Sequence, residues 1–189
     1  MFSKKNFQNI FLLTASILFY ATWDIIFVSI LLFNIIVGFL FGKFSNNKKD
    51  SFFTIGIIIL LFPLFFYKYF YFILTNLAYL LSFNLENQSY NLLLPLGISF
   101  YTFHGISYLI DLKNQKYPVE NSFIDYSVFI SYFPLLLAGP IERSNTLLPQ
   151  LKTFRVFNYN NAVSGTRLIL FGLWKKVFIS NSLALFNDK

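Results

Sequence analysis

LLLPLGISFYTFHGISYLIDLKNQKYPVENSFIDYSVFISYFPLLLAGPIERSNTLLPQ, residues 92–150, is the stretch that decides the fold. Its first part is apolar but carries His104 and Asp111, and its second part closes on Glu142 and Arg143 directly after a hydrophobic run. Ionisable side chains are costly at membrane depth, and where they occur they tend to mark a functional site. The stretch therefore predicts a membrane-embedded segment whose polar groups face something other than lipid.

The composition of the whole chain supports a membrane location. Of its 189 residues, 56% are hydrophobic and only 12% are charged, whereas an ordinary soluble domain has about 25% charged residues. The formal net charge is +7, but the lysines stand at the ends of apolar runs, which is typical of positive-inside topology and of contact with anionic head groups. We therefore expect a lipid bilayer, and not nucleic acid, as the partner of this charge. With no cysteine in the chain, disulfides and thiolate metal sites are excluded, and we expect no metal.

Four apolar segments are candidates for membrane spans, which need about 20 helical residues: 9–23, which is a little short, 25–41, 52–83 and 92–110. The third is predicted to be one tilted or kinked helix that contains Pro63. The positive-inside rule places the basic cluster 43–50 in the cytoplasm, with the Trp23–Asp24 turn and the loop 84–91 outside. We expect Asn34, inside the second span, to form an interhelical hydrogen bond.

The pattern changes after Pro118. Asn121 and Ser122 can cap a helix that begins near Phe123, but the apolar run 126–137 is too short for a span, which predicts a re-entrant or half-buried element. Residues 151–161 are predicted to form an interfacial loop, and 162–186 a helix at the interface. Together these features predict an all-α fold: a multi-pass transmembrane helical bundle with re-entrant or interfacial helices, in one domain over residues 1–189.

Five residues form the polar face of the fourth apolar segment. At about 100° per residue they fall within one narrow stripe of a single helix: Gly97, Tyr101, His104, Tyr108 and Asp111. One interpretation is a channel or cavity wall where His104 exchanges a proton. The other is packing, with Gly97 allowing close approach of a neighbour and His104 forming a neutral interhelical hydrogen bond.

Two further motifs are candidates for substrate binding. The Gly139-Pro140 turn presents Glu142 and Arg143, and Arg143 could bind a phosphate or carboxylate through two hydrogen bonds. The alternative is that these two charges only anchor the chain at the interface. Lys175, in Trp174-Lys175-Lys176, is either an interfacial anchor or a contact for the phosphate of a donor.

Several motifs in order resemble the membrane-bound O-acyltransferase family, in its bacterial branch that O-acetylates alginate and other cell-surface polysaccharides. The resemblance is carried by these segments: LPLGISFYTF at 94–103, SYLID at 107–111, YFP at 132–134, AGPI at 138–141, LPQL at 148–151 and GLWKKV at 172–177. The segments 16–23 and 34–42 are similar to early helices of the family. The resemblance implies an acyl thioester donor such as acetyl-CoA as co-substrate, with no bound cofactor, and a periplasmic or extracellular acyl-accepting partner.

The resemblance also implies that the essential histidine of the family lies beyond the point that matches Lys189. No residue here matches it, so we expect no catalytic residue in these 189 residues, which would be a truncated part of a multi-pass protein of the bacterial cytoplasmic membrane and inactive alone. The alternative is a non-catalytic membrane protein: a truncated paralogue, an assembly partner or a transporter-like bundle.

Overall fold

The computed structural model describes residues 4–45, 49–80, 93–137 and 139–180, and this part of the chain is helical with no strand. The helices are α1 Lys4–Ala21, α2 Ile25–Lys43, α3 Asp50–Leu80, α4 Ile98–Lys113, α5 Phe123–Ser131, α6 Phe133–Leu136, α7 Ser144–Lys152 and α8 Tyr159–Trp174, which continues as the π-helix η1 Lys175–Ser180. The chain forms two compact units, residues 1–154 and 155–189. The predicted all-α fold is confirmed.

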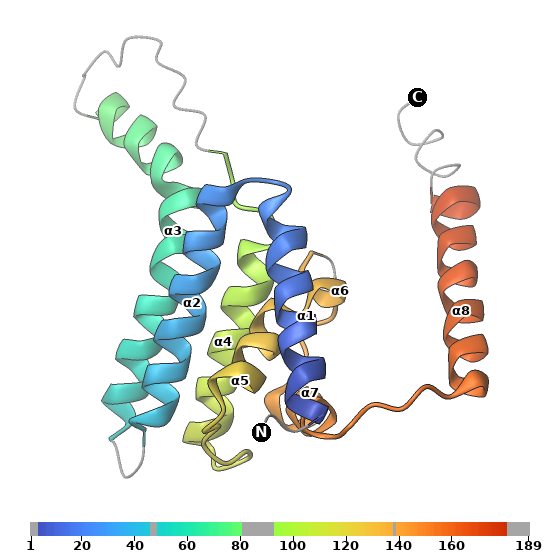
Figure 1. Ribbon diagram of the computed structural model, residues 1–189. Helices are drawn as coiled ribbons and strands as arrows, with labels where there is room; N and C mark the ends of the chain where they lie inside the picture. The colour runs from blue at the N-terminus through green and yellow to red at the C-terminus, as the bar shows by residue number, and fades with distance from the viewer. Residues whose placement is uncertain (1–3, 46–48, 81–92, 138, 181–189) are drawn as a thin grey trace. The chain divides into compact units, whose positions relative to one another are not determined.

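The first unit is a bundle in which α2 packs against α1, α3, α4 and α5 (Figure 1). Asp24 starts α2 as its N-cap, because its side chain accepts a hydrogen bond from the N–H of Ile26 at 2.7 Å. Asn34, 0% exposed, donates to the Oγ1 of Thr102 on α4 at 3.4 Å, so the predicted interhelical bond is confirmed. The helix α2 is therefore the central element of the bundle.

The third apolar segment forms the single helix that its length and Pro63 predict. The helix α3 has 31 residues and contains Pro63, and at 1.5 Å per residue it is about 46 Å long, more than the hydrocarbon core of a bilayer. The helix α2 and residues 50–70 of α3 are long and apolar enough to cross a membrane. Large side chains such as Ile58, Phe62 and Phe72 are more than half exposed on α3, as expected for a lipid-facing surface. The predicted loop 84–91 lies outside the described residues.

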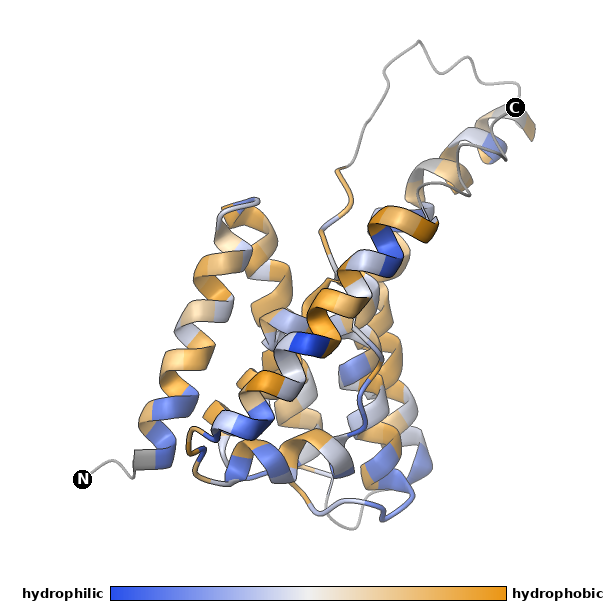
Figure 2. Ribbon diagram, turned by 90° about the vertical axis from the view of Figure 1, so that its right-hand side faces the viewer, coloured by the Kyte–Doolittle hydropathy of each residue, from blue (hydrophilic) through white to orange (hydrophobic). Residues whose placement is uncertain are grey.

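The lysine-rich segments lie at one end of the bundle. Lys113, at the end of α4, forms an ion pair with Asp50, at the start of α3, with 3.1 Å between Nζ and Oδ2. Lys5, near the start of α1, pairs with Asp125 of α5 at 2.9 Å. Figure 2 shows hydrophilic residues gathered at this end of the helices. We call it the basic end; the Trp23–Asp24 turn lies at the other end (Figure 1).

Three sequence-based boundaries need correction. The fourth apolar segment is not helical over 93–97: α4 begins at Ile98, because Gly97 is its N-cap with a left-handed φ of +72°. Gly97 therefore precedes the helix that was predicted to contain it. The predicted loop 151–161 overlaps two helices, because α7 ends at Lys152 and α8 begins at Tyr159, with the side chain of Asn158 accepting from the N–H of Asn161.

The capping prediction for the next helix is confirmed. Ser122 is the N-cap of α5, and its Oγ accepts from the N–H of Asp125 at 3.2 Å. The helix α5 has only nine residues, and 125–131 are all buried, so it is too short to cross a bilayer. Pro134 lies in the four-residue helix α6 that follows it after a break at Tyr132. The run 126–137 therefore packs inside the bundle as two short helices.

Candidate functional site

The helix α4 and its N-cap carry two adjacent rows of residues, which the sequence had grouped as one stripe. Residues seven apart lie on nearly the same face of a helix, since seven residues make almost two turns. Gly97, His104 and Asp111 form one row, and Tyr101 and Tyr108 form the other. The side chains of the second row and of His104 and Asp111 are at most 1% exposed. What each row contacts decides what it can do.

Gly97 lets the end of α6 lie against the start of α4. A Cβ added at Gly97 would overlap with the backbone carbonyl oxygen of Leu136, and the φ of +72° is itself one that favours glycine. The packing interpretation of Gly97, close approach of a neighbour, therefore agrees with the structure. From Leu136 the chain runs into the segment 139–144, which we call the return segment.

The return segment begins with a tight turn at Gly139. The N–H of Gly139 donates to the carbonyl of Leu135 at 3.1 Å, and an added Cβ would overlap with Leu135 itself. Pro140 follows and is exposed. Glycine is therefore the residue that this turn accommodates, and it directs Glu142 and Arg143 back toward α4.

His104 holds the return segment by its backbone. The N–H of Glu142 donates to the Nε2 of His104 at 3.1 Å. An imidazole nitrogen that accepts a hydrogen bond carries no proton, so this geometry assigns the neutral ring with its proton on Nδ1. By distance and angle Nδ1 has no hydrogen-bond partner within the described part of the chain, although the backbone carbonyl of Pro140 lies close enough to interact with the ring. The arrangement is that of the packing interpretation, in which Nε2 is already occupied.

Asp111 holds the side chains of the same segment. Its Oδ2 accepts from the Oγ of Ser144 at 2.7 Å, and its Oδ1 lies 3.3 Å from Nη1 of Arg143. The carboxylate is 0% exposed, whereas the side chain of Arg143 is 58% exposed. Burying a carboxylate is tolerated when its charge is paired and its oxygens are hydrogen-bonded. Asp111 thus fixes the start of α7 and points the remaining guanidinium donors outward.

The tyrosine row faces the interior of the bundle. Tyr101 packs edge-on against Tyr20 of α1, with ring centroids 6.3 Å apart. The hydroxyl of Tyr108 accepts from the N–H of Glu120 at 3.0 Å, and its ring lies where a Cβ of Gly42 would be. The structure therefore brings His104 and Asp111 together with the return segment and Gly97 against the end of α6, and it places Tyr101 and Tyr108 elsewhere.

A groove of about 390 Å³ lies beside this assembly, which is within the usual range for small-molecule sites. Its lining residues come from α4 and the return segment: Phe103, Ile106, Ser107, Ile110, Ile141 and Arg143. Of the candidates named from the sequence, only Arg143 lines it. We call it the α4 groove. His104 and Asp111 are not among its lining residues. They hold the return segment in place against α4, through the backbone of Glu142 and the side chain of Arg143.

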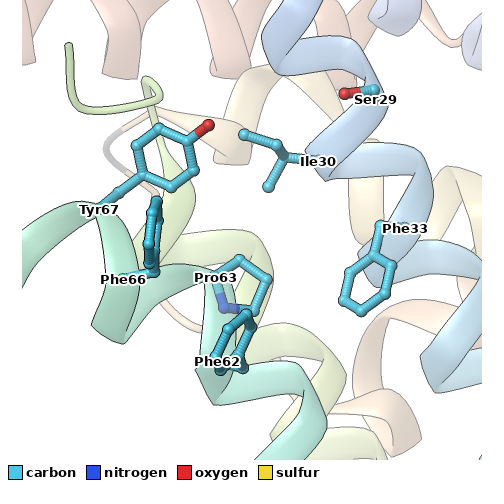
Figure 3. A pocket seen from close by; sticks show the side chains of 7 residues that line it. All are labelled: Ser29, Ile30, Phe33, Phe62, Pro63, Phe66 and Tyr67. Carbon is cyan, nitrogen blue, oxygen red and sulfur yellow. The ribbon is translucent and has the colours of Figure 1, made fainter. Parts of the chain in front are cut away.

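A second hollow of about 270 Å³ lies between α2 and α3 and is shown in Figure 3. Pro63 and the rings of Phe33, Phe62 and Phe66 form its walls, and Ser29 and Tyr67 supply its polar atoms. No residue that the sequence singled out for chemistry lines it. It is an apolar site without a charged group among its lining residues.

Sequence reasoning missed a group of ion pairs that surrounds α7. Lys152, at the end of α7, pairs with Glu120 at 2.7 Å, and Glu120 is 2% exposed. Asn9 of α1 donates both to Asp125 and to the carbonyl of Leu151. With Ser144 bound to Asp111, α7 is thus held at both of its ends. The signal in the sequence was weak, because these partners lie up to 142 residues apart.

The electrostatics of Lys152 strengthen this attachment. Partial burial lowers the pKa of Lys152, but its hydrogen bonds to Glu120 and Tyr117 outweigh that effect, so the pKa lies above its ordinary value. The ammonium also lies 5.5 Å from the ring centroid of Tyr117. Lys152 therefore stays charged throughout the physiological pH range.

Lys175 lies in the second unit, in η1, where its Nζ stands 4.5 Å from the ring centroid of Phe171. Trp174 stacks between Phe171 and Phe178 in the same unit. The roles predicted for Lys175, anchor or donor contact, stay predictions. Among the described residues, no three His, Asp or Glu side chains form a cluster that could hold a metal ion.

The assembly is suited to positioning a segment and presenting a cation. His104 and Asp111 are both engaged with the return segment, so the group left for a ligand is the guanidinium of Arg143. Arginine can bind carboxylate or phosphate oxygens through two parallel hydrogen bonds.

Comparison with known proteins finds relatives that are named as O-acetylating enzymes. No protein-family model and no solved structure matches the chain. The chain is 34% identical to a probable alginate O-acetylase of Azotobacter vinelandii and 32% identical to that of Pseudomonas aeruginosa, each over 98% of this chain. It is 30% identical, over 96% of its length, to a peptidoglycan O-acetyltransferase of Helicobacter pylori. The chain spans 39%, 37% and 40% of the length of these relatives. These relatives are O-acetylating enzymes by name, and over the part that the chain spans the similarity agrees with the resemblance of its motifs to the O-acetylating bacterial branch of the membrane-bound O-acyltransferase family.

Proposed function

We propose that this chain is the part of a bacterial membrane-bound O-acetyltransferase that forms and orders the wall of its substrate passage. The observation that carries the proposal is the attachment of the return segment to α4 through His104 and Asp111. Asp111 belongs to the SYLID motif at 107–111 that resembles the family, and His104 directly follows the motif at 94–103. Their burial means that the attachment is built into the fold and does not depend on a ligand.

The proposed reaction is transfer of an acetyl group from a thioester, such as acetyl-CoA, to a hydroxyl of a cell-surface polysaccharide or of a carrier. The hydroxyl oxygen bonds to the carbonyl carbon, the carbon–sulfur bond breaks, and the hydroxyl proton passes to a base. We propose that this base is a histidine outside residues 1–189, so that these residues alone do not catalyse transfer. Holding two substrates in reacting geometry can lower a barrier by about 7 to 11 kcal/mol, and the ordered wall contributes to that effect.

We further propose that the protein is a multi-pass protein of the bacterial cytoplasmic membrane with the basic end in the cytoplasm. The clustering of Lys5, Lys43 and Lys113 at one end supports this orientation. The donor would then reach the protein from the basic end, and an acyl-accepting partner from the other. Because the chain has no cysteine, single cysteines at Trp23 and Lys116 can be labelled cleanly in intact cells. Labelling of Trp23→Cys but not Lys116→Cys by an impermeant thiol reagent is expected; the reverse would overturn the orientation.

The activity is tested with membranes from cells that carry the intact gene and receive acetyl-labelled donor. Labelled glycan or carrier is expected with the intact gene, and none with residues 1–189 alone. Removal of the label by mild alkali identifies an ester. Absence of labelled product from the intact gene in a strain that makes candidate acceptors would contradict the proposal.

A non-catalytic membrane protein is the second candidate. The observation that favours it is that His104 and Asp111, the ionisable groups of the α4 row, are both occupied by structural contacts. The two candidates separate on one result. If the protein from the intact gene binds the acceptor or assembles with a partner, yet transfers no acetyl group in the assay above, it is the non-catalytic protein.

A further inference from the structure

The α4 groove is amphipathic along its length. Its walls are the apolar side chains of Phe103, Ile106, Ile110 and Ile141, and Arg143 stands among them as the charged group. Glu142 and Asp111 are absent from its lining residues, and Asp111 is fully buried behind Arg143. A ligand in the groove therefore meets hydrocarbon and one cation.

The charged and apolar parts of the groove lie at different depths. Arg143 is tied to Asp111, two residues before Lys113, whose ion pair with Asp50 belongs to the basic end. Phe103 lies eight residues earlier on α4 than Asp111, about 12 Å along the helix at 1.5 Å per residue. The groove thus extends from a cation near the basic end to an apolar wall deeper in the bundle. A lipid in the adjoining leaflet has its charged and apolar parts in the same order.

Two polar groups in the wall have capacity for a ligand. One N–H group of Arg143 donates to Asp111, and the side chain is 58% exposed, so further donors of its five N–H groups face outward. The hydroxyl of Ser107, buried in the wall, has no partner among the residues that the structure describes. Buried polar groups are usually hydrogen-bonded, and those that are not call for an explanation.

We propose that the α4 groove binds an anionic glycerophospholipid, with its phosphate on Arg143 and an acyl chain along Phe103, Ile106 and Ile110. A small soluble anion would leave the apolar walls exposed to water, whereas a neutral hydrocarbon would leave the N–H groups of Arg143 that do not bind Asp111 without a partner. The lipid is a bound component of the protein and not a substrate of acetyl transfer, so its binding is measured without any transfer of acetyl groups. By covering the joint between α4 and the return segment, it would shield the Arg143–Asp111 pair from water.

The test uses tryptophan fluorescence in vesicles. The chain has two tryptophans, so Trp23→Phe and Trp174→Phe give a silent background in which Phe103→Trp reports on the groove. Phe65→Trp, on an exposed part of α3, is the matched reporter of bulk lipid. Each protein is placed in phosphatidylcholine vesicles with the same mole fraction of brominated phosphatidylglycerol or brominated phosphatidylcholine, whose bromines quench nearby tryptophan.

At residue 103 we expect quenching to favour the anionic lipid about fivefold, the preference that one basic side chain near a membrane surface provides. At residue 65 we expect no preference. Arg143→Gln should abolish the preference at 103, and Arg143→Lys should keep it. Equal quenching by both lipids at 103, or a tryptophan there that neither lipid quenches while the one at 65 is quenched, would overturn the proposal.

A second substitution keeps the test decisive if Arg143→Gln does not fold. Ile141 is 50% exposed at the mouth of the groove, so Ile141→Glu adds a repelling charge there and Ile141→Gln is its neutral match. Ile141→Glu is expected to remove the anionic preference at 103, and Ile141→Gln to retain it. A preference that is equal in the two variants would count against the lipid site.

Discussion

The two rows of α4 residues differ in what they hold, although they lie side by side. Gly97, His104 and Asp111 contact α6 and the return segment, whereas Tyr101 and Tyr108 contact α1, α2 and the loop before α5. Both rows are buried, so burial does not distinguish them. The difference shows that the polar face of a helix is defined by what packs across from it, and that only one row orders the wall of the α4 groove.

The largest effect is expected at the head of the first row, with Gly97→Ala. A left-handed φ costs an ordinary residue about 1 to 2 kcal/mol, and the new methyl group overlaps with the carbonyl of Leu136, which cannot move as freely as a side chain. The backbone strain and the steric overlap together should lower the free energy of unfolding by about 3 kcal/mol. The measurement is unfolding by detergent titration, followed by circular dichroism.

Gly165→Ala is the matched control for Gly97→Ala. A Cβ at Gly165 in α8 meets nothing within 4 Å, so alanine there should be neutral or stabilise the helix by up to about 1 kcal/mol. Equal effects at the two glycines would show that the contact between Gly97 and Leu136 does not constrain the first row.

The next largest effect is expected from Arg143→Gln, which leaves the carboxylate of Asp111 buried with Ser144 as its remaining side-chain partner. Breaking a fully buried pair costs about 3 to 5 kcal/mol, but Arg143 is 58% exposed and the pair is partly screened. We therefore expect Arg143→Gln to lower the free energy of unfolding by about 2 kcal/mol in the same titration.

Asp111→Asn should cost less than Arg143→Gln, about 1 kcal/mol, because it removes the buried charge and keeps an acceptor for Ser144. The double variant should then be more stable than Arg143→Gln alone. If the double variant is the least stable of the three, the asymmetry argued from burial is wrong.

The sequence predicted the elements that local chemistry determines. The cap at Ser122, the course of α2 and the tight turn at Gly139 follow from residues within a few positions of each other. The stripe on α4 was also recognised, but its division into two rows was not. Helical spacing predicts the direction in which a side chain points, but it does not predict which element packs there.

The remainder depends on contacts that no local pattern records. The helix α7 was not predicted: its last two residues were placed in the loop 151–161, and 144–150 were assigned to no element. The polar residues of α7 become favourable in a helix only when Ser144 meets Asp111 and Lys152 meets Glu120. The start of α4 was placed too early because Gly97 reads as part of an apolar run until the carbonyl of Leu136 lies against it. Both errors concern residues whose conformation is fixed by a distant partner.

Substitutions of His104 test whether the first row acts by holding the backbone of the return segment. His104→Leu leaves the N–H of Glu142 without its acceptor, which should cost about 1.5 kcal/mol. His104→Gln retains an acceptor oxygen and should cost less than half as much. Under the proposed function, His104→Gln in the intact protein should also retain acetyl transfer; loss of transfer with unchanged stability would instead make the imidazole part of the chemistry.

Lys152 tests the attachment at the other end of α7. Lys152→Met leaves Glu120 with the N–H of Ser122 and the hydroxyl of Tyr117 as partners, and because the lysine is 39% exposed we expect only about 1 kcal/mol. The folded pKa of Lys152 is raised, so its contribution is complete below the unfolded value of 10.5 and is lost only as the pH rises through the folded value. The effect measured at pH 7 and at pH 9 should therefore be equal, and a smaller effect at pH 9 would contradict the raised pKa.

The smallest effects separate two neighbouring tyrosines of the bundle interior, Tyr108 and Tyr126, whose ring centroids are 4.8 Å apart and which are both 0% exposed. The hydroxyl of Tyr108 accepts from the N–H of Glu120, so Tyr108→Phe leaves a buried donor unpaired and should cost about 1 kcal/mol. The hydroxyl of Tyr126 has no hydrogen-bond partner in the described part of the chain, so Tyr126→Phe should change stability by about 0 kcal/mol or raise it slightly. Because the two rings have the same size and are both fully buried, a difference between the two variants reports on the hydroxyl groups, which are bonded at Tyr108 and unpaired at Tyr126. Equal losses of stability in the two variants would mean that the second row holds the loop before α5 by ring packing. The first row would then be the one that holds its neighbours by hydrogen bonds and an ion pair.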